Sequence, residues 1–316
     1  MDDLLTTDVD IDDVLRDVKD VARPAATQGE VADYIEPLKR AKPDSFAIAV
    51  VEMDGTEHCI GDVDVPFAIQ SISKVFSLVL AMRHAEAAGG VSDELWQRVG
   101  REPSGDPFNS LVQLEHERGI PRNPMINAGA LVVDDVLLDH CDPKEEALAL
   151  LSELAGEDIT FDDAVLAAEV DTGHRNRAMA SFLRSFDNLN NPVDDVLDAY
   201  LHQCAIAMSS RQLARSVRFL ANDGVDPPSG RRILPSVLAR RVAAIMLTCG
   251  TYDAAGEFAF QVGLPCKSGI AGGIAALVPD RMGVAVWSPP LDEAGNSLAG
   301  RLALHELAER LGLSIF

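Results

Sequence analysis

Strand-like runs of apolar residues lie near both ends of the chain, and helical periodicity fills most of the stretch between them. Residues 46–52 form an apolar run that the turn pair Asp54-Gly55 connects to residues 57–61, which predicts a β-hairpin. Towards the other end, three short β-rich runs are separated by turn residues and predict three more strands: residues 258–263, 273–278 and 282–287.

Helical patterns account for most of the remaining chain. Residues 1–22 alternate aspartate with leucine, valine and isoleucine, which predicts a short amphipathic helix or a frayed arm. Further helices are predicted over residues 32–40, from Ser71 to Gly89-Gly90, over much of 92–248, and over 298–313.

The two groups of strands are expected to join in one sheet, because an isolated hairpin is only marginally stable in water. The predicted fold class is α/β, of the α+β type: an antiparallel five-stranded sheet flanked by terminal helices, with a large all-helical lobe inserted between strands 2 and 3. We expect an acidic N-terminal arm (1–30) and a single domain (31–316). This domain has a sheet lobe (about 31–70 and 249–316) and a helical lobe (about 71–248). Ser71 would lie at the seam between the lobes, where clefts form.

Composition narrows the class of protein. With 316 residues, 47% hydrophobic and 24% charged, the chain can bury a sizeable core as a soluble globular protein. It contains no continuous apolar run long enough to cross a membrane, and its acidic first residues lack the basic charge of a signal peptide. We therefore expect a cytoplasmic protein with no membrane partner. The net charge of −23 and the lack of a basic stripe also argue against nucleic acid as a partner.

Cysteine and histidine spacing gives no metal motif. The five cysteines form no C-x-x-C pair, and their odd number and wide spacing favour reduced, buried thiols over a disulfide framework or a zinc site. His305-Glu306 begins like a zinc-protease helix, but Glu309 stands where the second histidine is needed. We therefore expect neither a catalytic metal nor an organic cofactor.

Ser71 and Lys74 are the first candidates for catalysis. They are three residues apart at the start of a predicted helix, so their side chains can share one face, whereas Ser73 should point elsewhere. A neutral lysine can take the proton of a serine hydroxyl and so activate it as a nucleophile, and burial favours the neutral form. A helix-capping serine followed by a surface lysine would give the same pattern.

Lys267-Ser268-Gly269 supplies a second motif after the predicted strand at 258–263. A Lys-Ser-Gly strand beside a Ser-x-x-Lys helix is the arrangement of serine acyl-transferases of the β-lactamase and penicillin-binding type. Such a strand can offer a backbone N–H to an oxyanion, although ordinary strand and turn residues also explain the tripeptide. Among the chain's three tyrosines, Tyr200 and Tyr252 could either relay protons or simply pack in the core.

Taken together, these segments resemble the serine-dependent glutaminase family. The resemblance runs from about Val31 to about Glu309 and includes many motifs in the family's order, although His174 stands where members often have another polar or an acidic residue. The matching segments are Asp33-Tyr34-Ile35, residues 65–67, Gln70-Ser71 with Lys74, residues 102–105, residues 123–130, Glu169, Arg175-Asn176, Cys249-Gly250, Tyr252-Asp253, residues 258–260 and 262–265, residues 267–273 and residues 287–291.

The resemblance implies a β-lactamase-like fold and hydrolysis of L-glutamine to L-glutamate and ammonia, with no cofactor. It also implies a homo-oligomer, either a dimer or a tetramer. Ser71 would be the nucleophile, Lys74 its base, and Tyr200 and Tyr252 the hydroxyl partners that relay protons and hold the substrate. The same comparison places other residues around the substrate: Asn127, Glu169 and Asn176 at its amino-acid end, Ile270 with its backbone N–H in the oxyanion hole, and Gln70 and Tyr34 in the pocket wall.

Two other functions remain open from the sequence. A β-lactam-processing serine amidohydrolase of the penicillin-binding type could use the same fold, although its substrate lies outside the cytoplasm. A non-catalytic amino-acid sensor could keep the pocket without the chemistry, but the intact Ser71, Lys74, Tyr252 and Lys267 argue against it.

Overall fold

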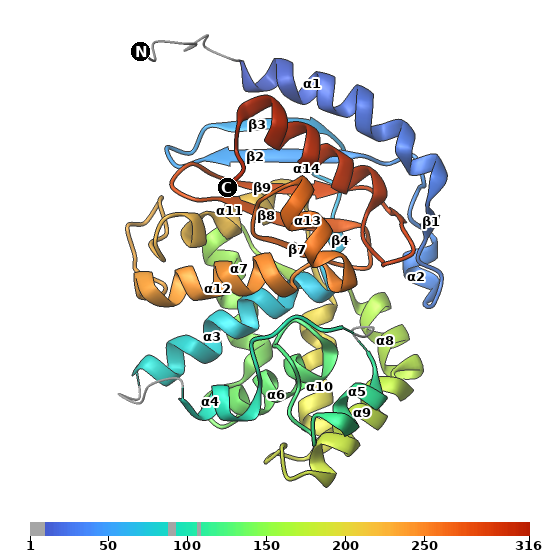
Figure 1. Ribbon diagram of the computed structural model, residues 1–316, viewed down its shortest axis with the longest axis vertical. Coiled ribbons are helices and arrows are strands. Elements are labelled where there is room, and N and C mark those ends of the chain that lie inside the picture. The colour runs from blue at the N-terminus through green and yellow to red at the C-terminus, as the bar shows by residue number, and fades with distance from the viewer. Residues whose placement is uncertain (1–9, 88–92, 106–108) are drawn as a thin grey trace.

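Five antiparallel strands form the main sheet, in the order β3-β2-β9-β8-β7 (Figure 1). The computed structural model describes residues 10–87, 93–105 and 109–316. Two of the strands come from the hairpin near the N-terminus and three from the C-terminal part, which confirms the predicted sheet. Their bounds are β2 Ala47–Glu52, β3 Glu57–Gly61, β7 Cys266–Ser268, β8 Gly273–Val278 and β9 Met282–Trp287.

The two faces of this sheet are covered by different helices. Alternate side chains of β2 point to opposite faces, so Ile48 and Val50 belong to the core under α1 (Ile11–Ala22) and α14 (Leu298–Leu311). Ala47 and Ala49 face the other side, where α11 (Ser210–Ala221) packs against β2, β8 and β9. Small residues on that side allow α11 to approach closely. The large aliphatic residues fill the space beneath the two terminal helices, which pack against each other on this face of the sheet (Figure 1).

Helix α1 lies in the acidic N-terminal segment. Asp10 caps the helix by accepting a hydrogen bond from the backbone N–H of Asp12. Leu15 and Val18 are fully buried, and the helix packs against α14 and β3. Of the two conformations expected for residues 1–22, the structure has the amphipathic helix over residues 11–22, and residues 1–9 lie outside the described part.

The helical lobe lies between β3 and β7 in the chain, as the sequence predicts. Helix α3 runs through it and is buried on all sides over its first ten residues, from Ser73 to Met82. The lobe's helices are α3 Ser73–Ala87, α4 Asp93–Arg98, α5 Leu111–His116, α6 Asn127–Leu138, α7 Pro143–Ala155, α8 Asp163–Thr172, α9 His174–Ser185, α10 Val193–Cys204, α11 and α12 Ser236–Cys249. The predicted end of α3 at Gly89-Gly90 lies outside the described residues.

Short strands add two small sheets that the sequence pattern does not predict. The strand β6 pairs with both β4 and β5, and β1 pairs with β10. Strands of two or three residues are too short for an alternation of apolar and polar positions to reveal them. Their bounds are β1 Glu30–Val31, β4 Phe67–Ala68, β5 Thr160–Phe161, β6 Ile206–Met208 and β10 Pro290–Leu291.

The prediction of a strand at 258–263 is wrong. The structure has helix α13 (Ala255–Gln261) there, and the third strand of the main sheet is β7. Phe258 and Val262 are buried at a spacing of four residues, whereas Phe260 between them is 86% exposed, so the apolar positions follow a helical face. Short apolar runs of this kind do not distinguish a strand from a helix.

The helix predicted at 32–40 is also too long. Only Glu36–Lys39 forms α2, and residues 30–31 before it are extended and pair with β10. Two 3-10 segments, η1 (Arg23–Gln28) and η3 (Tyr252–Ala254), follow α1 and precede α13. Among the helices of the described residues, none combines the length and the apolar character needed to cross a bilayer.

Candidate active site

Ser71 lies on a 3-10 turn, η2 (Gln70–Ile72), that leads directly into α3. Gln70 before it has a φ of +50°, an unfavourable conformation for a residue with a side chain. The turn contacts β7 and β8 on one side and α10 on the other, so Ser71 is held between the two lobes. The neighbouring Ser73 donates its hydroxyl to the carbonyl oxygen of Gln70 at 2.8 Å and is thus part of the turn itself.

Lys74 lies one helical turn after Ser71 and is buried. Its Nζ donates to Oδ1 of Asn127, the first residue of α6, at 2.6 Å, and lies 5.7 Å from the centre of the Tyr200 ring. Burial lowers the pKa of Lys74 to about 8, although Cys204 and Asp134 favour its charged form. A substantial fraction of Lys74 is therefore neutral near pH 8, as a general base requires.

Tyr252 joins the serine to the Lys-Ser-Gly strand. Its side chain is hydrogen-bonded to that of Ser71, and its hydroxyl donates to the carbonyl oxygen of Ser268 at 3.2 Å. Its φ of +56° is strained for an aromatic residue, so the backbone is bent to present this side chain. Burial raises the pKa of Tyr252, and the phenol stays protonated at neutral pH.

Lys267 lies beneath this tyrosine, with its Nζ 4.6 Å from the ring centre. It donates to the carbonyl oxygens of Gly250 at 3.0 Å and Ser268 at 2.6 Å. Burial, together with the nearby Lys74, holds the pKa of Lys267 well below its usual range. The lysine thereby ties the loop before Tyr252 to strand β7.

The predicted binding residues surround a cavity of about 430 Å³ beside Ser71. Lys74 is the one predicted site residue outside its wall, and Asn127 connects it to the cavity. The wall also contains residues that the sequence analysis did not assign to the site. The cavity is lined by Tyr34, Gln70, Ser71, Asn127, Glu169, Asn176, Tyr200, Tyr252 and Ile270, and additionally by Asn109, Thr172, Gly173, Arg175 and Cys204.

A buried carboxylate lies at one end of this cavity. Glu169 on α8 accepts hydrogen bonds from the hydroxyl of Tyr34 at 2.6 Å and the amide of Gln70 at 3.1 Å. Burial and the neighbouring Glu169 raise the pKa of Tyr34, which therefore remains a donor. Among the described residues no cation forms an ion pair with Glu169, so the site offers an uncompensated negative charge to a ligand.

Two asparagines from different helices form another part of the wall. Nδ2 of Asn127 on α6 donates to Oδ1 of Asn176 on α9 at 3.0 Å. Beside them the exposed Arg175 donates through Nε to the carbonyl oxygen of Asn109 at 3.0 Å. Arg175 stands next to Asn176 in the motif that carried the resemblance, and its charge was the signal that could have placed it at the cavity.

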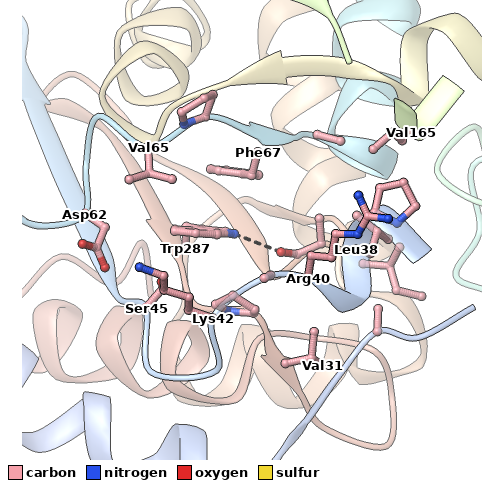
Figure 2. A pocket seen from close by; sticks show the side chains of 18 of the residues that line it. Val31, Leu38, Arg40, Lys42, Ser45, Asp62, Val65, Phe67, Val165 and Trp287 are labelled. Atoms are coloured by element: carbon pink, nitrogen blue, oxygen red, sulfur yellow. Dashed lines mark hydrogen bonds between the residues drawn. The ribbon is translucent and has the colours of Figure 1, made fainter. Parts of the chain in front are cut away.

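Ile270 lines both this cavity and a second one of about 480 Å³. Figure 2 shows the second cavity. The Ile270–Ala271 turn is held from behind, because the indole N–H of Trp287 donates to the carbonyl oxygen of Ala271 at 3.0 Å (Figure 2). Trp287 in turn stacks on Phe67 with ring centres 5.3 Å apart. On the other side of the turn, a Cβ at Gly269 would lie 2.5 Å from the carbonyl oxygen of Ile69, so only glycine allows this close approach.

Comparison with known proteins agrees with this geometry. The model of the glutaminase family matches residues 29–316. The chain belongs to the glutaminase family. It is 51% identical over 311 residues to a glutaminase of Methylobacterium radiotolerans, which covers 97% of this chain and 99% of the relative. A glutaminase of Rhodopseudomonas palustris is 53% identical over 310 residues, covering 97% of this chain and 98% of the relative.

Solved structures of the family share the fold. A probable glutaminase from Bacillus subtilis complexed with 6-diazo-5-oxo-L-norleucine superimposes with a TM-score of 0.87 at 35% identity, covering 100% of both chains. The predicted β-lactamase-like architecture is confirmed, because the family's sheet with its inserted helical lobe is present in full.

Proposed function

We propose that this glutaminase hydrolyses L-glutamine to L-glutamate and ammonia through an ester on Ser71. Lys74 Nζ takes the serine proton as Oγ attacks the side-chain amide carbon, and the developing oxyanion is held by the backbone N–H groups of Ser71 and Ile270. The proton then passes to the leaving nitrogen, directly or through Tyr252, and ammonia departs. Water activated by the same base attacks the ester, which releases glutamate and restores the serine hydroxyl.

One observation carries this proposal. Lys74 has a pKa of about 8 in a buried position one turn from Ser71, while the Ser71 hydroxyl is hydrogen-bonded to Tyr252. Asn127 Oδ1 accepts a hydrogen bond from the Lys74 amino group and so orients it, which leaves the lone pair of the neutral amine for the serine. A capping serine with a surface lysine would place neither group in this way.

The binding residues support an amino-acid substrate. Glu169 suits the α-ammonium group, and the amides of Asn127 and Asn176 together with Arg175 suit the α-carboxylate. The Bacillus subtilis structure contains 6-diazo-5-oxo-L-norleucine, an analogue of glutamine, which agrees with this choice. A β-lactam is recognised through its own carboxylate, so a buried anion in the site would not help to bind it.

Ser71→Ala tests the mechanism. Ammonia release from glutamine is expected to fall by several orders of magnitude, while calorimetry still detects glutamine binding. Substantial turnover in this variant would exclude a serine ester. Two assays on the unmodified protein separate the other two functions: hydrolysis of a chromogenic cephalosporin favours a β-lactam enzyme, and glutamine bound unchanged for hours favours a sensor.

We also propose that the protein works in the cytoplasm as a homo-oligomer, a dimer or a tetramer. All five cysteines are free thiols, which is typical of a reducing compartment. Cell fractionation would test the location, and export of the protein would contradict it. Light scattering on a sizing column would test the oligomeric state, and a monomer at micromolar concentration would contradict that proposal.

A further inference from the structure

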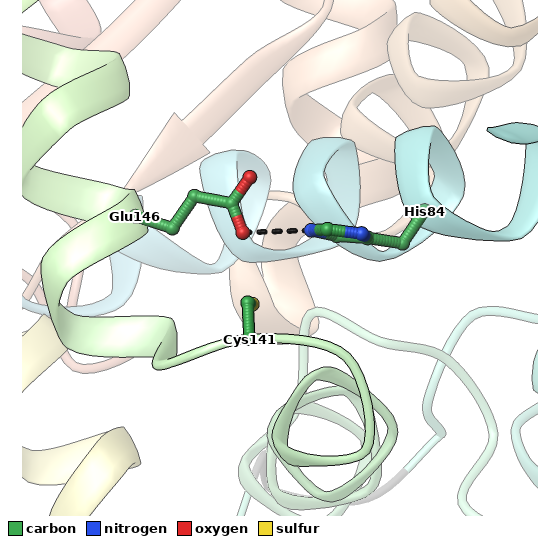
Figure 3. A group of neighbouring side chains, drawn as sticks. All are labelled: His84, Cys141 and Glu146. Atoms are coloured by element: carbon green, nitrogen blue, oxygen red, sulfur yellow. Dashed lines mark hydrogen bonds and ion pairs between the residues drawn. The ribbon is translucent and has the colours of Figure 1, made fainter.

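A second group of reactive side chains lies in the helical lobe, away from the cavity beside Ser71. His84 Nε2, Cys141 Sγ and a carboxylate oxygen of Glu146 all lie within 4.8 Å of one another (Figure 3). They come from three separate segments: α3, the turn after α6, and the first turn of α7. The sequence gives no sign of this cluster, because 57 positions separate His84 from Cys141 and the fold alone brings them together.

We propose that His84, Cys141 and Glu146 bind a zinc ion that ties α3 to the junction of α6 and α7. An imidazole nitrogen, a thiolate sulfur and a carboxylate oxygen are the three ligand types that Zn²⁺ takes in proteins, and water can complete a tetrahedral site. Zinc bonds of about 2.0 to 2.3 Å place neighbouring ligand atoms roughly 3.3 to 3.6 Å apart. The three ligand atoms, within 4.8 Å of one another, already lie near that spacing.

The carboxylate is already oriented for one metal bond. Arg83 forms an ion pair with Oε1 of Glu146, whereas His84 Nε2 faces the other oxygen, Oε2, at 2.7 Å. Arg83 can therefore stay paired with Oε1 while Oε2 binds the metal. Metal-bound carboxylates are commonly held in this way by hydrogen bonds from neighbouring residues. His84 binds through Nε2 as the neutral tautomer that carries its hydrogen on Nδ1, and Cys141 loses its thiol proton to solvent, so the thiolate and the carboxylate together balance the charge of the ion.

The backbone holds the ligands in place. The N–H groups of His140 and Cys141 both donate to the carbonyl oxygen of Leu137, at 2.8 and 2.9 Å, which fixes the turn after α6. The ring of His140 stacks on that of His84 with centres 5.6 Å apart and planes within 5°, and so restricts its rotation. All three ligands are half-buried, which leaves an open side for metal entry and for a water ligand. The chain's net charge of −23 also attracts cations.

The site does not depend on the proposed reaction, and the test is a direct titration. Untagged protein is stripped with a chelator and titrated with ZnCl₂ by calorimetry, and with CoCl₂ by absorbance. One equivalent per chain is expected to bind, with a thiolate-to-cobalt band and a rise of several degrees in Tm under excess zinc. Cys141→Ser should lose the band and bind zinc at least about tenfold more weakly, and His84→Asn should also weaken binding.

Cys59→Ser is the matched control, because Cys59 is the other half-buried cysteine and lies outside the cluster. It should bind zinc like the unmodified protein, and glutaminase turnover reports correct folding in each variant. Equal affinity in Cys141→Ser and Cys59→Ser, or no binding at all, overturns the proposal. If Cys141→Ser does not fold, X-ray absorption at the zinc edge of the unmodified protein decides, since a shell without sulfur also overturns it.

Discussion

The hydroxyl of Tyr34 donates to Oε1 of Glu169 at 2.6 Å, across 135 positions of the sequence. The amide of Gln70 donates to the same oxygen at 3.1 Å. Because both donors bind Oε1, the second carboxylate oxygen stays available to an ammonium group. Tyr34 thus orients the carboxylate from the sheet side while α8 supplies it from the helical side.

Tyr34→Phe should therefore weaken glutamine binding more than it slows the reaction. The variant loses one charge-assisted hydrogen bond, worth about 1.5 to 3 kcal/mol, so KM should rise about tenfold or more with kcat within about threefold. Steady-state ammonia release measures both constants. Glu169→Gln, which removes the charge itself, should raise KM further. An unchanged KM in both variants would rule out this end of the cavity as the ammonium site.

The pKa of Lys74 predicts the pH dependence of the reaction. The general base must be neutral, and the buried Lys74 loses its proton around pH 8, so kcat/KM should rise with pH and level off above about 8. A profile of kcat/KM for the free enzyme checks this. Lys74→Ala should lose most of the activity and the rising limb with it. A flat profile from pH 6 to pH 9 would contradict Lys74 as the base.

The indole N–H of Trp287 should contribute to both turnover and stability. Trp287→Phe keeps an aromatic ring on Phe67 but removes the hydrogen bond to Ala271 O, which holds the Ile270 turn. We expect kcat to fall about three- to tenfold, with a loss of about 1 kcal/mol in the free energy of unfolding. Kinetics and urea unfolding measure the two effects. Trp96→Phe, the same change at the chain's other tryptophan, should leave kcat unaltered.

Gly269→Ala tests the approach of the Lys-Ser-Gly strand to the serine turn. The added Cβ would lie 2.5 Å from the carbonyl oxygen of Ile69, and this backbone atom cannot move without displacing Gln70 and Ser71. We expect kcat to fall by at least about a hundredfold, since a displacement near 1 Å has an effect of that size. Gly256→Ala is the control, because a Cβ there meets no atom within 4 Å. Equal kcat in the two variants would show that the close contact is not needed.

The candidate site follows from the sequence more directly than the elements around it. Ser71, Lys74 and the two tyrosines stand in short motifs whose chemistry can be stated without coordinates. Strand β7 could not be predicted in the same way, because it has only three residues, all buried, and so shows no alternation of apolar and polar positions. The apolar residues around Phe258, which precede it, lie on one face of a helix.

Contacts between distant segments explain what else was missed. Asn109 and Arg175 line the cavity because α9 packs beside the segment before α5, and no local pattern shows that the two segments meet. His84 and Cys141 come together for the same reason, through the packing of α3, α6 and α7. Motifs thus indicate candidate reactive groups, whereas the cavity wall and the proposed metal ligands depend on tertiary packing.

The packing of helix α1 can be tested by mutation. The result shows whether the acidic N-terminal segment is an appendage or part of the sheet lobe. Leu15 is fully buried between α14 and the strands, so Leu15→Ala should lower the free energy of unfolding by about 2 to 4 kcal/mol. Val21→Ala on the same helix is the control, because Val21 is 43% exposed and its truncation should cost less than about 0.5 kcal/mol. Urea unfolding followed by circular dichroism measures both variants. Equal stabilities would mean that α1 is a detachable arm. A large loss in Leu15→Ala alone would mean that the sheet, and with it the strand that carries Lys267, needs α1 as its cover.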